Sequence, residues 1–132
     1  MTAGRAHLIL ISTLLLAGCT DTRGRALKTM KRFKDDQLRR EVALFYKDAF
    51  AEHRKIKSVT MMPKYWSQAF QDLRPERITA YQDGFAFCLE IKGDAESGLY
   101  IVPLGMDVAP KPTPWASYEK LSDGIFWYSF NP

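Results

Sequence analysis

An uncharged, strongly apolar run of ten residues, Leu8 to Ala17, constrains the folding of this chain more than any other feature. A helix needs about 20 apolar residues to cross a hydrocarbon core of about 30 Å, so this run is too short to span a membrane. A short basic segment that holds Arg5 precedes it, and small residues follow it. This order is typical of a secretory signal peptide. We therefore expect residues 1–18 to be removed and the remaining chain to fold by itself.

The residues that end this run, Leu16-Ala17-Gly18-Cys19, resemble the lipobox of bacterial lipoprotein precursors. The resemblance implies cleavage between Gly18 and Cys19 and a diacylglycerol on the Cys19 sulfur, with a further fatty acid such as palmitate on the new amine in many bacteria. Two or three acyl chains hold a protein firmly to a membrane. The alternatives are a secretory signal without lipid and a short buried helix.

The residue after Cys19 bears on which membrane would hold the protein. In bacteria with two membranes, lipoproteins with Asp directly after the cysteine tend to stay on the inner one. Here that residue is Thr20. By resemblance, we expect the cell envelope, and the outer membrane facing the periplasm where two membranes are present.

The net charge of +4 is distributed unevenly. From Arg23 to Lys57 there are 12 Lys or Arg against 5 Asp or Glu, and from Ser58 to Pro132 there are 6 against 9. One interpretation is contact with anionic headgroups, about 1 kcal/mol for each cation near the surface. The alternative is a solvated tether and helix face. Nucleic acid is not expected as a partner of an exported protein. The candidates for membrane-surface contact are Arg23, Arg25, Lys28, Lys31 and Arg32.

Two helices are predicted after the anchor. Residues 19–34 form a basic tether, extended or partly helical. Asp35 to Lys55 has apolar residues at helical spacing on one face, with Arg39 largely away from it. A shorter helix is expected from Pro63 to Leu73, because proline suits a first turn. The apolar face of the longer helix holds Leu38, Val42, Phe45, Ala49 and Ile56.

The C-terminal half has the alternation of strands. Residues 78–82 and 85–91 flank Asp83-Gly84 as a hairpin. Phe85, Phe87, Leu89 and Ile91 would share one face, with Ala86, Cys88 and Glu90 on the other. Further strands are expected at residues 98–103 and 125–130. The order of elements predicts one α+β domain over residues 35–132, with one or two N-terminal helices packed on a small antiparallel sheet of about four strands.

The last strand is rich in aromatic residues. Ile125 and Trp127 would face one way, and Tyr128 and Phe130 the other. One face would be left open unless loops cover it, and exposed apolar patches often mark interfaces. The residues considered for partner binding are Trp127, Tyr128, Phe130 and Trp115; burial of the strand on both faces is the alternative.

The sequence carries no recognisable catalytic or metal-binding motif, and no cofactor is expected. Lipidation of Cys19 would leave Cys88 as a single free thiol, which we expect to be a buried small hydrophobe rather than a nucleophile. The strands at Gly98–Tyr100 and Gly124–Tyr128 are similar to those of small uncharacterised bacterial envelope proteins, a resemblance that implies no activity. We expect a non-enzymatic module that binds an envelope protein, or alternatively a structural lipoprotein that contacts the membrane surface.

Overall fold

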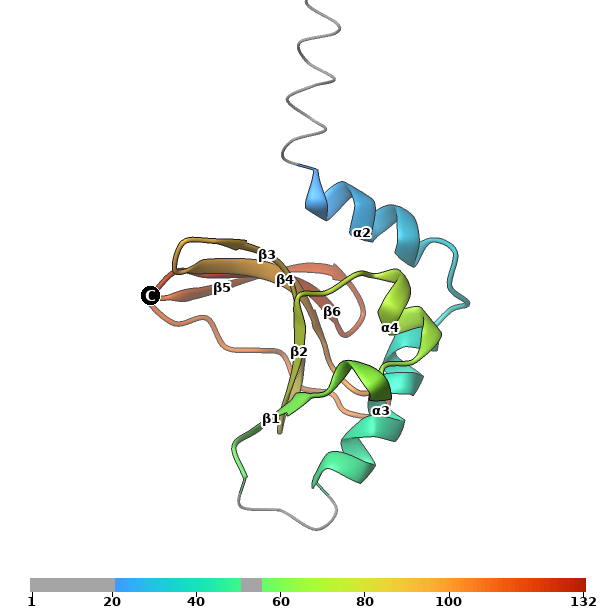
Figure 1. The fold of residues 1–132 in the computed structure, drawn as a ribbon. Coiled ribbons are helices and arrows are strands. Elements are labelled where there is room, and N and C mark those ends of the chain that lie inside the picture. Colours follow the sequence, from blue (N-terminus) through green and yellow to red (C-terminus); the bar gives the residue numbers. More distant parts are fainter. Residues whose placement is uncertain (1–20, 51–55) are drawn as a thin grey trace, which may run out of the picture.

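The computed structural model describes residues 21–50 and 56–132, and these form an α+β fold. The predicted fold class is therefore confirmed, although the antiparallel sheet has six strands rather than about four. The expectations for Gly18, Cys19 and the end of the longer helix lie outside the described residues. The elements are α2 (Thr22–Met30), α3 (Gln37–Phe50), β1 (Ser58–Met61), the 3-10 turn η1 (Pro63–Tyr65), α4 (Gln68–Asp72), β2 (Arg77–Tyr81), β3 (Gly84–Lys92), β4 (Ala95–Ile101), β5 (Ala116–Ser122) and β6 (Ile125–Phe130) (Figure 1).

The sheet runs in the order β1-β2-β3-β4-β6-β5, and every neighbouring pair is antiparallel. The sequence did not predict β1 or β5, which are the two edge strands. Residues at a sheet edge need little apolar surface, and β5 reads Ala-Ser-Tyr-Glu-Lys-Leu-Ser without a clear alternation. β1 does alternate, as Ser-Val-Thr-Met, but four residues are too short a run to identify a strand from the pattern alone.

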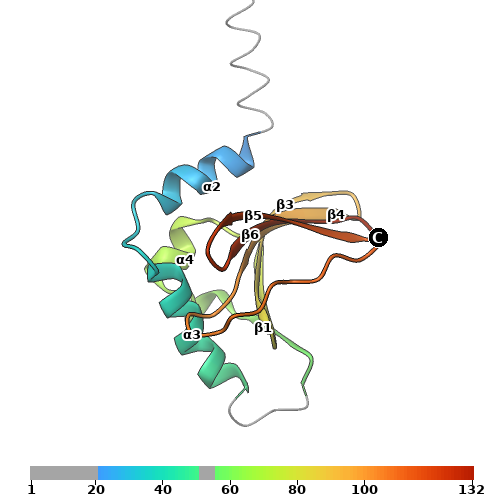
Figure 2. The ribbon, with the colours of Figure 1, turned by 180° about the vertical axis from the view of Figure 1, so that it is seen from behind.

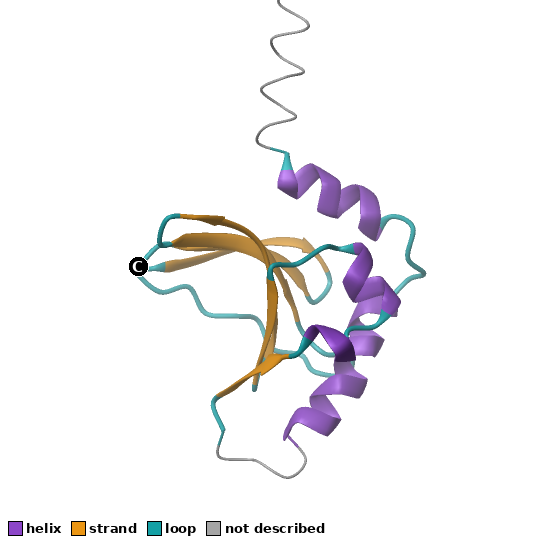
Figure 3. Ribbon diagram, viewed as in Figure 1, coloured by secondary structure: helices purple, strands orange, loops and turns teal. Residues whose placement is uncertain are grey.

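The helices lie against one face of the sheet, where the main core forms (Figure 3). Leu38 and Val42 of α3 are buried there, with Phe45 and Ala49 partly buried, which confirms most of the predicted apolar face. Ile56 is exposed instead, beyond the end of α3. The helix begins at Gln37, two residues later than predicted, because Asp36 has a φ of 61° and cannot continue a right-handed turn.

The second predicted helix, Pro63 to Leu73, is broken in two. Trp66 is extended, and the Ser67 hydroxyl then accepts a hydrogen bond of 3.3 Å from the Phe70 amide. Serine competes for backbone groups in this way and favours a new helix start over continuation of the old one. The result is η1, an extended step, and the five-residue helix α4.

A bulge in β3 changes the predicted faces of this strand. Cys88 pairs with Gly98 and Glu90 with Ser97, so Leu89 is an extra residue. Paired residues point to the same face, and the bulge therefore moves Glu90 to the helix side and Ile91 to the opposite side. The prediction that Ile91 shares a face with Phe85 and Phe87 is wrong for this reason.

The turn between β2 and β3 lies one residue earlier than predicted. Tyr81 pairs with Gly84, so Gln82 and Asp83 form the connection. Gly84 is needed there for space, because a Cβ at this position would lie 2.5 Å from a Tyr100 ring carbon. By contrast, the predicted turn at Asp123-Gly124 is confirmed, and Gly124 has the positive φ that such a turn favours.

The segment from Val102 to Trp115 runs beneath the face of the sheet that the helices leave open (Figure 2). The guanidinium of Arg39, in α3, fixes the first residues of this segment. It donates hydrogen bonds to the carbonyls of Val102 (3.0 Å), Pro103 (3.3 Å) and Met106 (3.2 Å). Arg39 was expected to lie largely away from the apolar face of this helix, and the structure adds that its partly buried side chain binds the segment that follows β4. Hydrophobic periodicity does not show that a half-buried guanidinium can satisfy the carbonyls of an irregular segment.

The bulge at Leu89 makes Gly98 a residue that cannot be enlarged. A Cβ at position 98 would overlap the Phe87 carbonyl oxygen and lie 2.9 Å from the Leu89 amide. We expect Gly98→Ala to lower the free energy of unfolding by about 3 kcal/mol or more, measured by urea denaturation.

Gly93→Ala is the matched control, because Gly93 has a φ of 61° but open space around it. That change is expected to cost only about 1 kcal/mol, from backbone strain alone. Equal losses for the two variants would contradict the packing role of Gly98.

Candidate functional site

Helix α2 is held against the domain, which fixes the direction of its charged side chains. Asp21 caps it by accepting a hydrogen bond of 3.1 Å from the Gly24 amide. Ala26 is 3% exposed and belongs to the main core, with Met30 packed beside it. Of the two forms expected for the basic tether, the structure thus shows the helical one.

Arg23 provides a second attachment for α2. Its Nη1 donates to Glu119 Oε2 of β5 at 2.7 Å, and its guanidinium lies 5.7 Å from the centre of the Trp127 ring. The hydrogen bond from Arg23 lowers the pKa of the Glu119 carboxyl. This member of the predicted surface-contact set is therefore used within the fold.

A groove of about 480 Å³ lies between α2 and α4, and four cations line it. We call it the basic groove. Ala26, Leu73 and Leu89 give it an apolar floor, and all four cationic side chains are exposed. The complete lining is Thr22, Arg25, Ala26, Lys28, Thr29, Arg32, Gln68, Gln71, Asp72, Leu73, Arg74 and Leu89.

The charge of the basic groove is almost unopposed. Asp72 is the single acid in its lining, and its Oδ1 accepts a hydrogen bond of 2.9 Å from Gln68 Nε2. Four cations and one carboxylate give the lining a net charge of +3. Within the described part of the chain, the ion pairs join other residues, and none includes a cation of the basic groove. Chemically, such a surface can bind an anion.

The structure brings together part of the predicted membrane-contact set. Arg25, Lys28 and Arg32 line the basic groove, whereas Arg23 is paired with Glu119 and Lys31 is exposed outside the lining. Sequence reasoning missed Arg74. It lies one residue before Pro75, at the end of a predicted helix, and no local pattern connects it to a segment more than 40 residues earlier.

The four aromatic residues considered for partner binding do not form one surface. Trp127 is partly buried against the main core, and Tyr128 is 4% exposed on the opposite face. Trp115 and Phe130 are 58% and 38% exposed, and the Asn131 amide donates to the Trp115 carbonyl at 2.8 Å. Trp115 and Phe130 therefore stay available to a partner, and Tyr128 does not.

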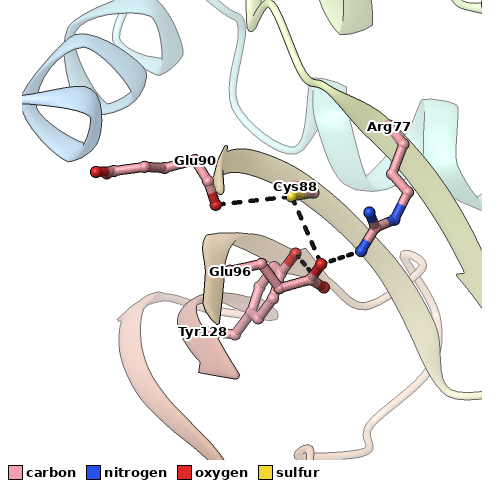
Figure 4. A network of polar contacts seen from close by, with 5 residues as sticks. All are labelled: Arg77, Cys88, Glu90, Glu96 and Tyr128. Carbon is pink, nitrogen blue, oxygen red and sulfur yellow. Dashed lines mark hydrogen bonds and ion pairs between the residues drawn. The ribbon is translucent and has the colours of Figure 1, made fainter. Parts of the chain in front are cut away.

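Cys88 lies in a small polar network on the face away from the helices (Figure 4). It is 1% exposed, and its Sγ lies 3.8 Å from both the Glu90 carbonyl and Glu96 Oε2. Glu96 also pairs with Arg77 and accepts a hydrogen bond of 3.4 Å from the Tyr128 hydroxyl. The thiol is buried, as predicted.

The network has the properties of a structural cluster. Burial raises the pKa of the Cys88 thiol, and the Glu96 carboxylate adds to this effect. A thiol held in its neutral form is a poor nucleophile. Burial likewise raises the pKa of the Tyr128 hydroxyl, which keeps it protonated and able to donate to Glu96. We therefore place the candidate functional site at the basic groove and not at Cys88.

Across residues 21–50 and 56–132, no three His, Cys, Asp or Glu side chains gather closely enough to hold a metal ion. None of the helices in the described part of the chain combines the length and apolar character needed to cross a bilayer.

Comparisons with known proteins identify no relative whose binding site could be compared with the basic groove. No family model, curated protein or solved structure matches it.

Proposed function

We propose that this protein is a non-enzymatic lipoprotein of the bacterial cell envelope that contacts the surface of its own membrane through the basic groove. Acyl chains on Cys19 hold it there, on the outer membrane facing the periplasm where two membranes are present. The observation that carries the proposal is the unpaired charge of the basic groove, one wall of which is α2, the helix that begins three residues after Cys19.

Chain geometry keeps α2 close to the anchor. The three residue steps from Cys19 to Thr22 span at most about 11 Å. Charges interact with an anionic surface over a Debye length of about 8 Å at physiological salt. Helix α2 therefore starts no more than about one and a half Debye lengths from the anchor, a distance at which screening weakens the attraction to headgroups without abolishing it.

The docking of α2 makes this attraction directional. Ala26 in the core and the contact of Arg23 with Glu119 stop the helix from turning about its axis. Arg25, Lys28 and Arg32 are consequently presented together with Arg74, rather than spread around a free tether. With about 1 kcal/mol from each cation near the surface, the set orients the whole domain on the membrane.

A second candidate function is binding of an envelope protein at Trp115 and Phe130. Both rings are exposed, and β5 beside them is an edge strand. Exposed aromatic residues next to an open edge can add a partner strand. This alternative would use a surface distinct from the basic groove, so both functions can be tested separately.

Lipidation is tested by expressing the full chain in bacteria and measuring the mass of the mature protein. We expect loss of residues 1–18 and added acyl groups, both abolished by Cys19→Ser. Cys88→Ser is the matched control and is expected to keep them. A mature protein without acyl groups would contradict the anchor.

Surface contact is tested without the lipid, on the chain 19–132 with Cys19→Ser, which contains every residue that the structure describes. We expect it to sediment with vesicles that contain phosphatidylglycerol. About 0.5 M salt should release it, because screening is strong at that ionic strength. Replacing Arg25, Lys28 and Arg32 by Gln should weaken binding at least about tenfold.

The control replaces three exposed cations outside the basic groove, Lys57, Lys64 and Lys111, by Gln. It lowers the net charge equally and should weaken binding much less. Equal losses in the two triple variants would show that overall charge, and not the basic groove, drives the contact.

A further inference from the structure

We propose that the basic groove is a binding site for a phosphate monoester, supplied by the headgroup of an anionic lipid in the membrane that holds the protein. The inference rests on the proposed function and names the group that the basic groove takes. It starts from the observation that the charges surround a concavity and do not lie on a flat face.

The type of cation favours phosphate. Three of the four are arginines, Arg25, Arg32 and Arg74. A guanidinium presents its donors in a planar fork that binds two oxygens of one phosphate. A phosphate monoester carries about −1.5 to −2 charges at pH 7. The net lining charge of +3 is therefore better matched by one monoester than by a single carboxylate or a singly charged phosphodiester.

Hydroxyl donors accompany the arginines. Thr22 and Thr29 line the basic groove together with Arg25, at spacings of three and four residues that place side chains on one helical face. Threonine hydroxyls add neutral donors to phosphate oxygens. The apolar floor of Ala26, Leu73 and Leu89 fits the carbon part of an ester, and the volume of about 480 Å³ lies in the range of small-molecule sites.

The backbone at Arg74 is an independent indication. Its φ is 53°, in the left-handed region, directly after the C-cap of α4. Glycine is the usual residue at this position, because a side chain there is strained. Elsewhere in the described chain, three glycines and Asp36 take positive φ, and Asp tolerates this conformation through local hydrogen bonds. Arg74 thus combines a strained backbone with a side chain that lines the cationic groove, and this combination indicates a functional role for the side chain.

The first test titrates the chain 19–132 carrying Cys19→Ser with glycerol 3-phosphate at constant ionic strength. We expect saturable binding of one ligand, seen as NMR shifts confined to the amides around Arg25, Thr29 and residues 71–74. Acetate at the same ionic strength should produce no saturable shift. Absence of saturable phosphate binding overturns the site.

The second test identifies the source of the phosphate. Vesicles with phosphatidic acid, a monoester, and with phosphatidylglycerol, a diester, are matched for surface charge. We expect at least tenfold tighter binding to phosphatidic acid, reversed by glycerol 3-phosphate. Soluble phosphate binding without this preference would overturn the lipid source and assign the site to a free phosphate ester.

These results separate the inference from the proposed function. Equal, salt-sensitive binding to both vesicles without binding of glycerol 3-phosphate overturns the monoester site and leaves the surface contact intact. Absence of binding to either vesicle removes the surface contact itself.

The decisive variant is Arg74→Gly. It removes one guanidinium and also the backbone strain, so we expect at least tenfold weaker phosphate binding together with an unchanged or higher Tm, by up to about 4 °C. Asp36→Gly is the matched control, because it relieves a similar positive φ outside the basic groove. It should keep phosphate affinity. Full affinity in Arg74→Gly would overturn the role of Arg74 and the argument from its strain.

Discussion

The contact of Phe70 with two other rings holds the helical layer on the sheet, and the position of the basic groove depends on it. Phe70 is fully buried, with its ring centre 5.4 Å from that of Phe45 in α3 and 4.9 Å from that of Phe87 in β3. Truncation of a buried phenylalanine typically costs about 3–5 kcal/mol. Phe70 is the largest of the side chains that anchor this five-residue helix, and together with the buried Ala69 and Leu73 it orients α4 and the adjoining Arg74.

The apolar pattern was sufficient to predict two central elements of this core, α3 and β3. Val42 and Phe45 identified α3, and the alternation of Phe85 and Phe87 identified β3. The pattern failed where polar backbone interactions decide the structure. The Ser67 cap divides a predicted helix, and the bulge at Leu89 exchanges the faces of the residues after it. Of the two edge strands, β1 is too short and β5 too irregular in its pattern to be identified. Each of these features is decided by hydrogen bonds or strand pairing, which the spacing of apolar residues in the sequence does not record.

The candidate site was predictable only in part. The density of positive charge pointed to Arg25, Lys28 and Arg32, but their meeting with Arg74 follows from tertiary packing of α2 against the domain. The same limit explains the aromatic strand. Alternation placed Trp127 and Tyr128 on opposite faces, yet it could not show that Arg23 lies over Trp127 or that Tyr128 is buried.

The central claim is that the basic groove faces the bilayer when the protein is anchored. Cys88 is buried and Cys19 is acylated under this account, so a single added cysteine would be the reactive thiol. Gln71→Cys, at the basic groove, and Val108→Cys, on the exposed segment beneath the sheet, can each carry a spin label in the lipidated protein on anionic vesicles. Accessibility to a water-soluble relaxation agent should fall on membrane binding for the label at position 71 and stay unchanged at position 108. Equal accessibility of the label at position 71 with and without vesicles, or protection at position 108 instead, would contradict the account.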